Sequence, residues 1–262
     1  MSFAVMSFAE KMAAIADAIR GKTGKTEKLS LDEMATEINE ISTGERDINP
    51  EWTDWRYFSH YDNRNDLVAK LKYNDTSKGT NFSHMFYCCG SLTSIPQLDT
   101  SKGTNFNAMF YGCSALTTVP ALDISKGTNF GSMFSQCFAL TSIPALNISN
   151  GTEFSHMFNY CRNLTSIPQL DLSKVAYSGG LSNTFRECFA LVDLNIVGTI
   201  NVAGLNVQYS PLSHDSLMSI INALADKTGV SGTWKVTLGA TNLAKLTAEE
   251  IAIAEGKGWT LA

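Results

Sequence analysis

The sequence predicts a mixed α/β protein built around a solenoid of stacked 24-residue coils. The first observation is a fixed period, because equivalent residues recur every 24 positions between residues 81 and 168, as is typical of repeat architectures. The second is that the recurring residues are mainly apolar, which predicts one shared interior along the stack. The third is a change of pattern on either side of the repeats, towards helices before them and strand–helix units after them.

We therefore expect three parts. Residues 1–50 form a helical N-terminal attachment segment and linker, residues 51–199 the solenoid, and residues 200–262 strand–helix coils that cap its far end. Capping boxes that begin at Ser7 and at Ser30 predict two amphipathic helices within residues 1–42. Residues 51–77 lack the Met-Phe pair and the Cys of the later units, so they form a degenerate first coil.

Each repeat begins with apolar residues at three- and four-residue steps, which predicts a short or irregular helix. The recurring columns are Phe82, Phe106, Phe130 and Phe154; Met85, Met109, Met133 and Met157; Phe86, Phe110, Phe134 and Phe158; and Leu92, Leu116, Leu140 and Leu164. A segment around Pro96 and its equivalents follows and is expected to be a short strand or extended. The turn after it contains Gly103 or Gly127, which are free to take a positive φ.

The C-terminal part predicts larger strand–helix units with parallel strand pairing. We expect strands at residues 205–207, 234–238 and 259–261, and a helix over residues 213–225. Thr247 and Glu250 form a capping box, which opens a second helix that ends at Gly256.

Composition and charge narrow the function. Hydrophobic residues make up 44% and charged residues 17% of the chain, which is globular. The net charge of −5 argues against a nucleic-acid binder, which normally carries a basic patch. We find no apolar run of the roughly 18 residues that span a bilayer, so we expect no membrane insertion. The N-terminus also lacks the pattern of a signal peptide.

The cysteines suggest packing more than chemistry. Five of the six share one repeat position: Cys89, Cys113, Cys137, Cys161 and Cys188. Neighbouring coils would bring them close enough for disulfides, and zinc is a further alternative. A reduced, buried ladder is favoured, because free Cys is a small residue that is often buried. Cys88 is expected to point outward.

Two other columns raise the question of metals. His60, His84, His156 and His214 are expected on the surface, with a weak adventitious metal site as the alternative. Asp75, Asp99, Asp123, Asn147 and Asp171 are expected to cap turns through their own backbone, with calcium as the alternative. We predict no metal, no cofactor and no catalytic residues, because no catalytic motif is present.

The motif from Met109 to Ser125 resembles the BspA-like leucine-rich repeats of bacterial surface proteins, and the likeness covers roughly residues 75–198. The segment 15–26, with residues 31–35, resembles the N-termini of prophage tail-region proteins. Residues 211–217 and 238–259 look like the end module that accompanies these repeats in proteins of gut Firmicutes and their phages. The resemblance implies a leucine-rich-repeat-like solenoid that serves in adhesion or ligand binding and not in catalysis.

These observations favour a non-enzymatic recognition module. Our first hypothesis is a phage or prophage tail-associated protein that binds a host surface or a partner protein, with residues 1–42 attaching it to the tail assembly. The alternative is a BspA-like adhesin, secreted or on the cell surface, so the chain is either virion-associated or extracellular. The expected ligand is a protein or a glycan on a cell surface. The expected contacts are small polar residues of the extended segments: Thr93, Ser94, Gln97, Thr117, Thr118, Thr141, Ser142, Thr165, Ser166 and Gln169.

Overall fold

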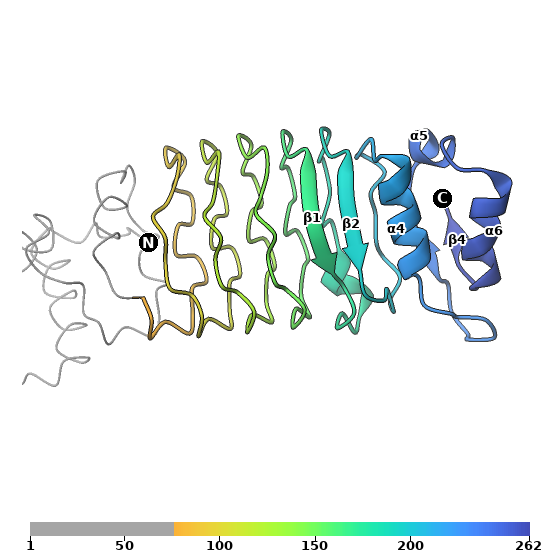
Figure 1. The fold of residues 1–262 in the computed structure, drawn as a ribbon, viewed down its shortest axis with the longest axis horizontal. Coiled ribbons are helices and arrows are strands. Elements are labelled where there is room, and N and C mark those ends of the chain that lie inside the picture. Colours follow the sequence, from red (N-terminus) through yellow and green to blue (C-terminus); the bar gives the residue numbers. More distant parts are fainter. Residues whose placement is uncertain (1–75) are drawn as a thin grey trace, which may run out of the picture. The chain divides into compact units, whose positions relative to one another are not determined.

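The computed structural model describes residues 76–262 (Figure 1). The two expected N-terminal helices, the linker and the degenerate first coil lie outside the described residues, and so do His60 and Asp75. The elements are β1 (Ser166–Asp171), η2 (Ser178–Leu181), β2 (Asp193–Val197), α4 (His214–Ala223), β3 (Lys235–Val236), α5 (Ala240–Leu243), α6 (Ala248–Gly256) and β4 (Thr260–Leu261).

Equivalent residues of successive coils lie side by side. Parallel bridges join Asn81 to Asn105, Asn105 to Asn129, and Asn129 to Glu153. The rings of Phe86 and Phe110 stack with centroids 5.3 Å apart and planes within 4°. The described residues thus form a mixed α/β structure with stacked ladders, which is compatible with a repeat solenoid. Its strands make two open two-stranded parallel sheets, β1–β2 and β3–β4.

The shared interior expected from the repeat is confirmed. The Phe, Met and Leu columns and the Cys column from Cys113 to Cys188 are buried in the described coils. Burying one such apolar side chain stabilises a fold by about 1.5–3 kcal/mol. The ladders therefore supply most of what holds neighbouring coils together.

The expected short helix is wrong, because this part of each coil is a chain of β-turns. Met85 N donates to Phe82 O at 3.3 Å, and Cys89 N donates to Phe86 O at 3.1 Å. The third residues of these turns, His84 and Cys88, have φ of 60° and 58°, as in a type II turn. Each turn takes four residues, so apolar residues recur at helical steps without any helix.

These turns also bond to the next coil. Phe82, His84 and Phe86 donate their backbone N–H groups to Asn105, Asn107 and Met109 oxygens, at 2.8–2.9 Å. The amides between them bond within the coil, so the two kinds of hydrogen bond alternate along the chain. We call this side the turn face; it comprises residues 82–91, 106–115, 130–139, 154–163 and 181–190.

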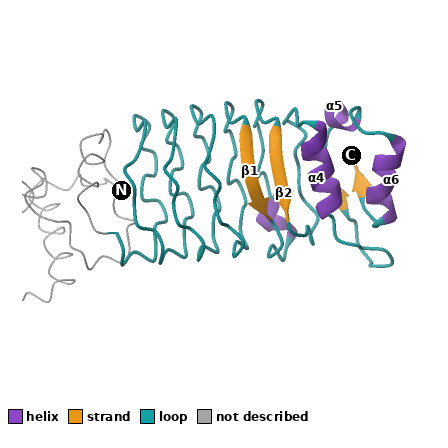
Figure 2. Cartoon of the chain, viewed as in Figure 1, coloured by secondary structure: helices purple, strands orange, loops and turns teal. Residues whose placement is uncertain are grey.

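The segments around the prolines form the opposite side, the extended face. A strand pair appears only in its last two coils, as β1 and β2 (Figure 2). Proline has no backbone N–H to donate. Pro168 nevertheless lies within β1, where the pairing with β2 shifts register between Ile167 and Leu170, and β2 carries Asn195 at the equivalent position. The strand expectation is confirmed for β1 and β2, and the described segments around Pro96, Pro120 and Pro144 carry no strand.

The positive φ expected for the turn glycines is wrong. Gly103 and Gly127 are absent from the positive-φ residues. They are buried against the coil's own phenylalanine, and a Cβ at Gly103 would lie 2.3 Å from Phe106 Cζ. The ladder needs glycine here for close approach of a ring and not for a left-handed backbone.

The C-terminal expectations hold with one exception. The helix α4, the capping box of α6 and the parallel pair β3–β4 are confirmed. The expected strand at residues 205–207 is only an isolated bridge between Asn206 and Thr237. Helix α4 lies beside β2, where the hydroxyl oxygens of Ser216 and Ser219 accept from Leu194 N and Ile196 N at 2.8 and 3.2 Å. The helix thereby covers the edge of the β1–β2 sheet.

Candidate functional site

The cysteine ladder is a structural feature. All six thiols are free, Cys88 is exposed, and Cys113, Cys137, Cys161 and Cys188 are buried. Each buried thiol donates to the carbonyl of a phenylalanine one coil earlier, as Cys137 does to Phe110 O at 3.2 Å. Burial raises the pKa of all four, that of Cys188 to about 12. The favoured reduced, buried ladder is therefore confirmed for Cys113 to Cys188, whereas Cys89 is reduced but only half-buried.

The Asp/Asn column caps turns as expected. Asp99 Oδ1 accepts from the backbone N–H and the hydroxyl of Ser101 at 3.0 and 2.7 Å, and Asp123 does the same with Ser125. The hydrogen bonds from Ser125 lower the pKa of Asp123. Within residues 76–262, no three His, Cys, Asp or Glu side chains come together as a metal site.

The contact residues expected from the sequence do share one face. All are exposed except Ser166, which is half-buried. Several contribute to their own ladder, because the Thr117 and Thr165 hydroxyls donate to Thr93 O and Thr141 O at 3.2 and 3.0 Å. Their role in binding stays a prediction.

A second surface, which follows the turn face and continues to Tyr209 beyond it, was missed by the sequence reasoning. It carries aromatic and arginine side chains from four neighbouring coils, all exposed except the half-buried Tyr160, and we call it the aromatic–arginine surface. Its residues are Phe138, Tyr160, Arg162, Arg186, Phe189 and Tyr209. Phe189 is 51% and Tyr209 44% exposed, although large aromatic side chains are usually well covered.

The members of this surface contact one another. The Arg162 guanidinium lies 5.6 Å from the Phe138 ring centre and 5.4 Å from that of Tyr160. It also pairs with Glu187, with Nη2 and Oε2 2.7 Å apart. The Arg186 guanidinium contacts the same tyrosine, 5.7 Å from the Tyr160 ring centre. Phe189 and Tyr209 meet edge to face at 6.2 Å. Stacking and pairing fix these long side chains before any partner arrives.

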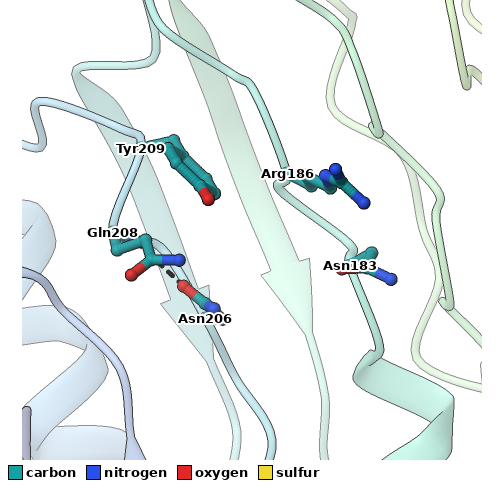
Figure 3. Close-up of a pocket in the computed structure, with 5 residues that line it drawn as sticks. All are labelled: Asn183, Arg186, Asn206, Gln208 and Tyr209. Atoms are coloured by element: carbon teal, nitrogen blue, oxygen red, sulfur yellow. Dashed lines mark hydrogen bonds between the residues drawn. The ribbon is translucent and has the colours of Figure 1, made fainter.

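A pocket opens within this surface. Asn183, Arg186, Asn206, Gln208 and Tyr209 line a volume of about 190 Å³. Figure 3 shows Asn206, Gln208 and Tyr209 on one segment, facing the backbone of the coil that carries Asn183 and Arg186. The tips of Asn183 and Arg186 point away from Tyr209 in this view, so backbone forms much of that wall.

The pocket lies where the hydrogen-bond ladder of the turn face stops. His156, Phe158 and Tyr160 still donate to Ser182, Thr184 and Arg186 oxygens at 2.8–3.0 Å. Their equivalents, 27 residues further on, are Asn183, Phe185 and Glu187. Within the described part of the chain, the N–H groups of these three residues have no protein acceptor.

The sequence does mark this surface, because one position of the repeat changes residue type from coil to coil. Phe138, Arg162 and Phe189 share one column with Gly90 and Ser114. A column that varies in this way is not needed for the ladder, and its large members come together only at one end of the stack.

The part of the chain that matches a family model contains the regular 24-residue repeats. Residues 56–170 match the family described as "Mycoplasma protein of unknown function, DUF285". The DUF285 match covers Phe138, Tyr160 and Arg162 and ends before Arg186, Phe189 and Tyr209. No curated protein and no solved structure matches the chain.

None of the helices within residues 76–262 has the length and apolar character that crossing a membrane requires.

Proposed function

We propose that the chain is a recognition module without catalytic activity, and that the aromatic–arginine surface makes the contact with its partner. The observation that carries this proposal is that exposed Phe, Tyr and Arg side chains gather on a rigid face. Aromatic residues and Arg are enriched at the centres of protein interfaces and dominate binding energies there.

The rigidity of the scaffold supports the same proposal. Each turn is bonded to its own coil and to a neighbouring coil, so the side chains start from fixed backbone positions. A surface that is ordered before binding loses less conformational entropy on association. The arrangement thus suits recognition of a broad partner.

We further propose that the stack is a leucine-rich-repeat-like solenoid of the BspA type and that it serves as a phage or prophage tail-associated protein. The support is the resemblance of the 24-residue motif and of the N-terminal segment described above. Fractionation of the native host tests this placement. Protein in purified virions supports it, and protein on uninfected cells would instead support the surface adhesin.

Binding of the labelled full-length chain to intact host cells tests the recognition proposal. The variant carrying Phe189→Ser and Tyr209→Ser should lose about tenfold or more in apparent affinity, since interface anchors contribute about 2 kcal/mol or more each. The matched control carries Thr117→Ala and Thr141→Ala on the extended face and should bind like the unaltered chain.

Loss of binding by the extended-face variant alone would move the contact to the residues expected from the sequence. Equal binding by both variants and the unaltered chain would overturn the proposal that either face recognises the cell.

A further inference from the structure

The hydrogen-bond ladder of the turn face ends at the coil of residues 181–190, which leaves a row of backbone N–H groups without a protein acceptor among residues 76–262. Asn183 and Glu187 keep the left-handed φ of the earlier coils, 54° and 58°. The backbone therefore follows the same path as in the coil of His156 and Tyr160, whose N–H groups point to the next coil. By this equivalence, the N–H groups of Asn183, Phe185 and Glu187 point towards the segment of Asn206–Tyr209.

That segment is held away from them by its other contacts. Val207 N donates forward to Thr237 O at 2.8 Å, and α4 replaces the extended segment of this coil. On the turn face, contacts between these two coils lie at the two ends of the gap. A Cβ on Gly204 would lie 3.0 Å from Ser178 O, and Tyr209 meets Phe189 at the other end.

The two walls of the pocket have different chemistry. One offers backbone N–H donors, and its charged residue is Arg186, whose guanidinium is held over Tyr160. Glu187 is neutralised by Arg162. The facing wall offers the carboxamides of Asn206 and Gln208 and the ring of Tyr209. Asn206 Oδ1 accepts from Gln208 N at 3.1 Å, which fixes the orientation of that wall (Figure 3).

We propose that this pocket binds an acidic sugar residue of a glycan. A carboxylate accepts several N–H hydrogen bonds, so it suits the wall that offers backbone donors. A carboxamide both donates and accepts, which matches sugar hydroxyls, and an aromatic ring gives the apolar side of the sugar a surface to pack on. The volume suits one ring, and the closed ends exclude a peptide strand that runs through.

This inference rests on the proposed function, because it names the ligand class of the same surface. The test uses the full chain and amide NMR spectra, with glucuronate as the probe and glucose as its neutral match. Glucuronate should shift the amide signals of Asn183, Phe185 and Glu187, and glucose should not. Gln208→Ala should weaken glucuronate binding by about tenfold, whereas Gln169→Ala on the extended face should leave it unchanged.

Equal shifts with glucose and glucuronate would overturn the proposal, and so would shifts confined to residues outside the pocket. Tighter binding of a glutamate-rich peptide than of glucuronate would assign the pocket to an acidic peptide instead and also overturn it. Spectra of the variants that otherwise match the unaltered chain show that the fold is kept. Loss of cell binding in the Phe189→Ser, Tyr209→Ser variant together with no glucuronate shift would reject the acidic sugar and leave the recognition proposal standing.

Discussion

At the scale of single residues, the cysteine column shows how burial decides chemistry. The four buried thiols point into the interior and donate to carbonyls, whereas Cys88 is exposed on the turn face. The thiolate is the reactive form of cysteine, so a raised pKa makes the buried thiols unreactive in two ways, through access and through charge.

We expect Cys88 to react with a disulfide reagent at pH 8 within the first fast phase. Cys113, Cys137, Cys161 and Cys188 should react only on unfolding, because their pKa values lie well above that pH. Absorbance of the released thiol measures the two phases. Cys88→Ser should reduce the fast phase, leaving the half-buried Cys89 as its remaining source, and reaction of the four buried thiols at the rate of Cys88 would contradict the buried column.

The left-handed column is a second residue-scale feature. Ser132 has a φ of 56°, and its backbone donates to Ser155 O at 2.8 Å. Non-glycine residues are strained in this conformation by about 1–2 kcal/mol.

Ser132→Gly should therefore stabilise the chain by about 1 kcal/mol after the extra chain entropy of glycine is counted. Urea unfolding followed by circular dichroism measures the change. Ser155→Gly, at a position without positive φ, serves as the control and should destabilise. Destabilisation by both substitutions would show that the strain at residue 132 is negligible.

At the scale of elements, the phenylalanine stacks connect one coil to the next. Phe134 stacks on Phe110 and on Phe158, at 5.4 and 5.7 Å. Phe185, near the end of the same stack, has one such neighbour, Phe158, at 6.0 Å. Both side chains are fully buried, so they differ mainly in the number of stacked rings.

Phe134→Ala should cost about 4 kcal/mol of unfolding free energy. Phe185→Ala should cost about 1 kcal/mol less, because it removes one ring–ring contact and not two. Parallel urea titrations of the two variants give the difference. A larger loss for Phe185→Ala would mean that ring stacking does not set the strength of the coil–coil contact.

Much of the element scale could be predicted from the sequence, and the misses have physical causes. The buried columns follow from apolar residues at a fixed period, and α4 and α6 follow from their caps. The consecutive β-turns could not be distinguished from a helix by sequence, because four-residue turns place apolar residues such as Phe82 and Phe86 four positions apart, which is also a helical spacing. Left-handed positions are filled by His84, Ala108 and Ser132, which share no side-chain type that marks them.

The candidate site was harder to predict, because it consists of residues that depart from the repeat. The sequence reasoning followed what repeats and chose the Thr and Ser residues of the extended face. The aromatic–arginine surface consists of residues that break the repeat, and the pocket depends on how α4 spaces the last coils. Neither is visible until the coils are stacked.

At the scale of the whole molecule, the ladder implies that coils are interchangeable units. Deleting residues 106–129 removes one full period and joins Asn105 to Phe130, so each column stays in register. Nearest-neighbour stability then predicts a folded chain with a lower unfolding free energy. Deleting residues 106–117 breaks the register and should abolish the cooperative transition. Equal tolerance of both deletions in thermal unfolding would contradict the stacked arrangement.

Hydrogen exchange of single backbone amides, followed by NMR on the native chain, tests the central claim most directly, because it detects both the ladder and the place where it stops. The amides of His156, Phe158 and Tyr160 should exchange slowly, and those of Asn183, Phe185 and Glu187 should exchange much faster. Equal protection of the two sets, or fast exchange of the first, would contradict a turn-face ladder that ends at the proposed binding pocket.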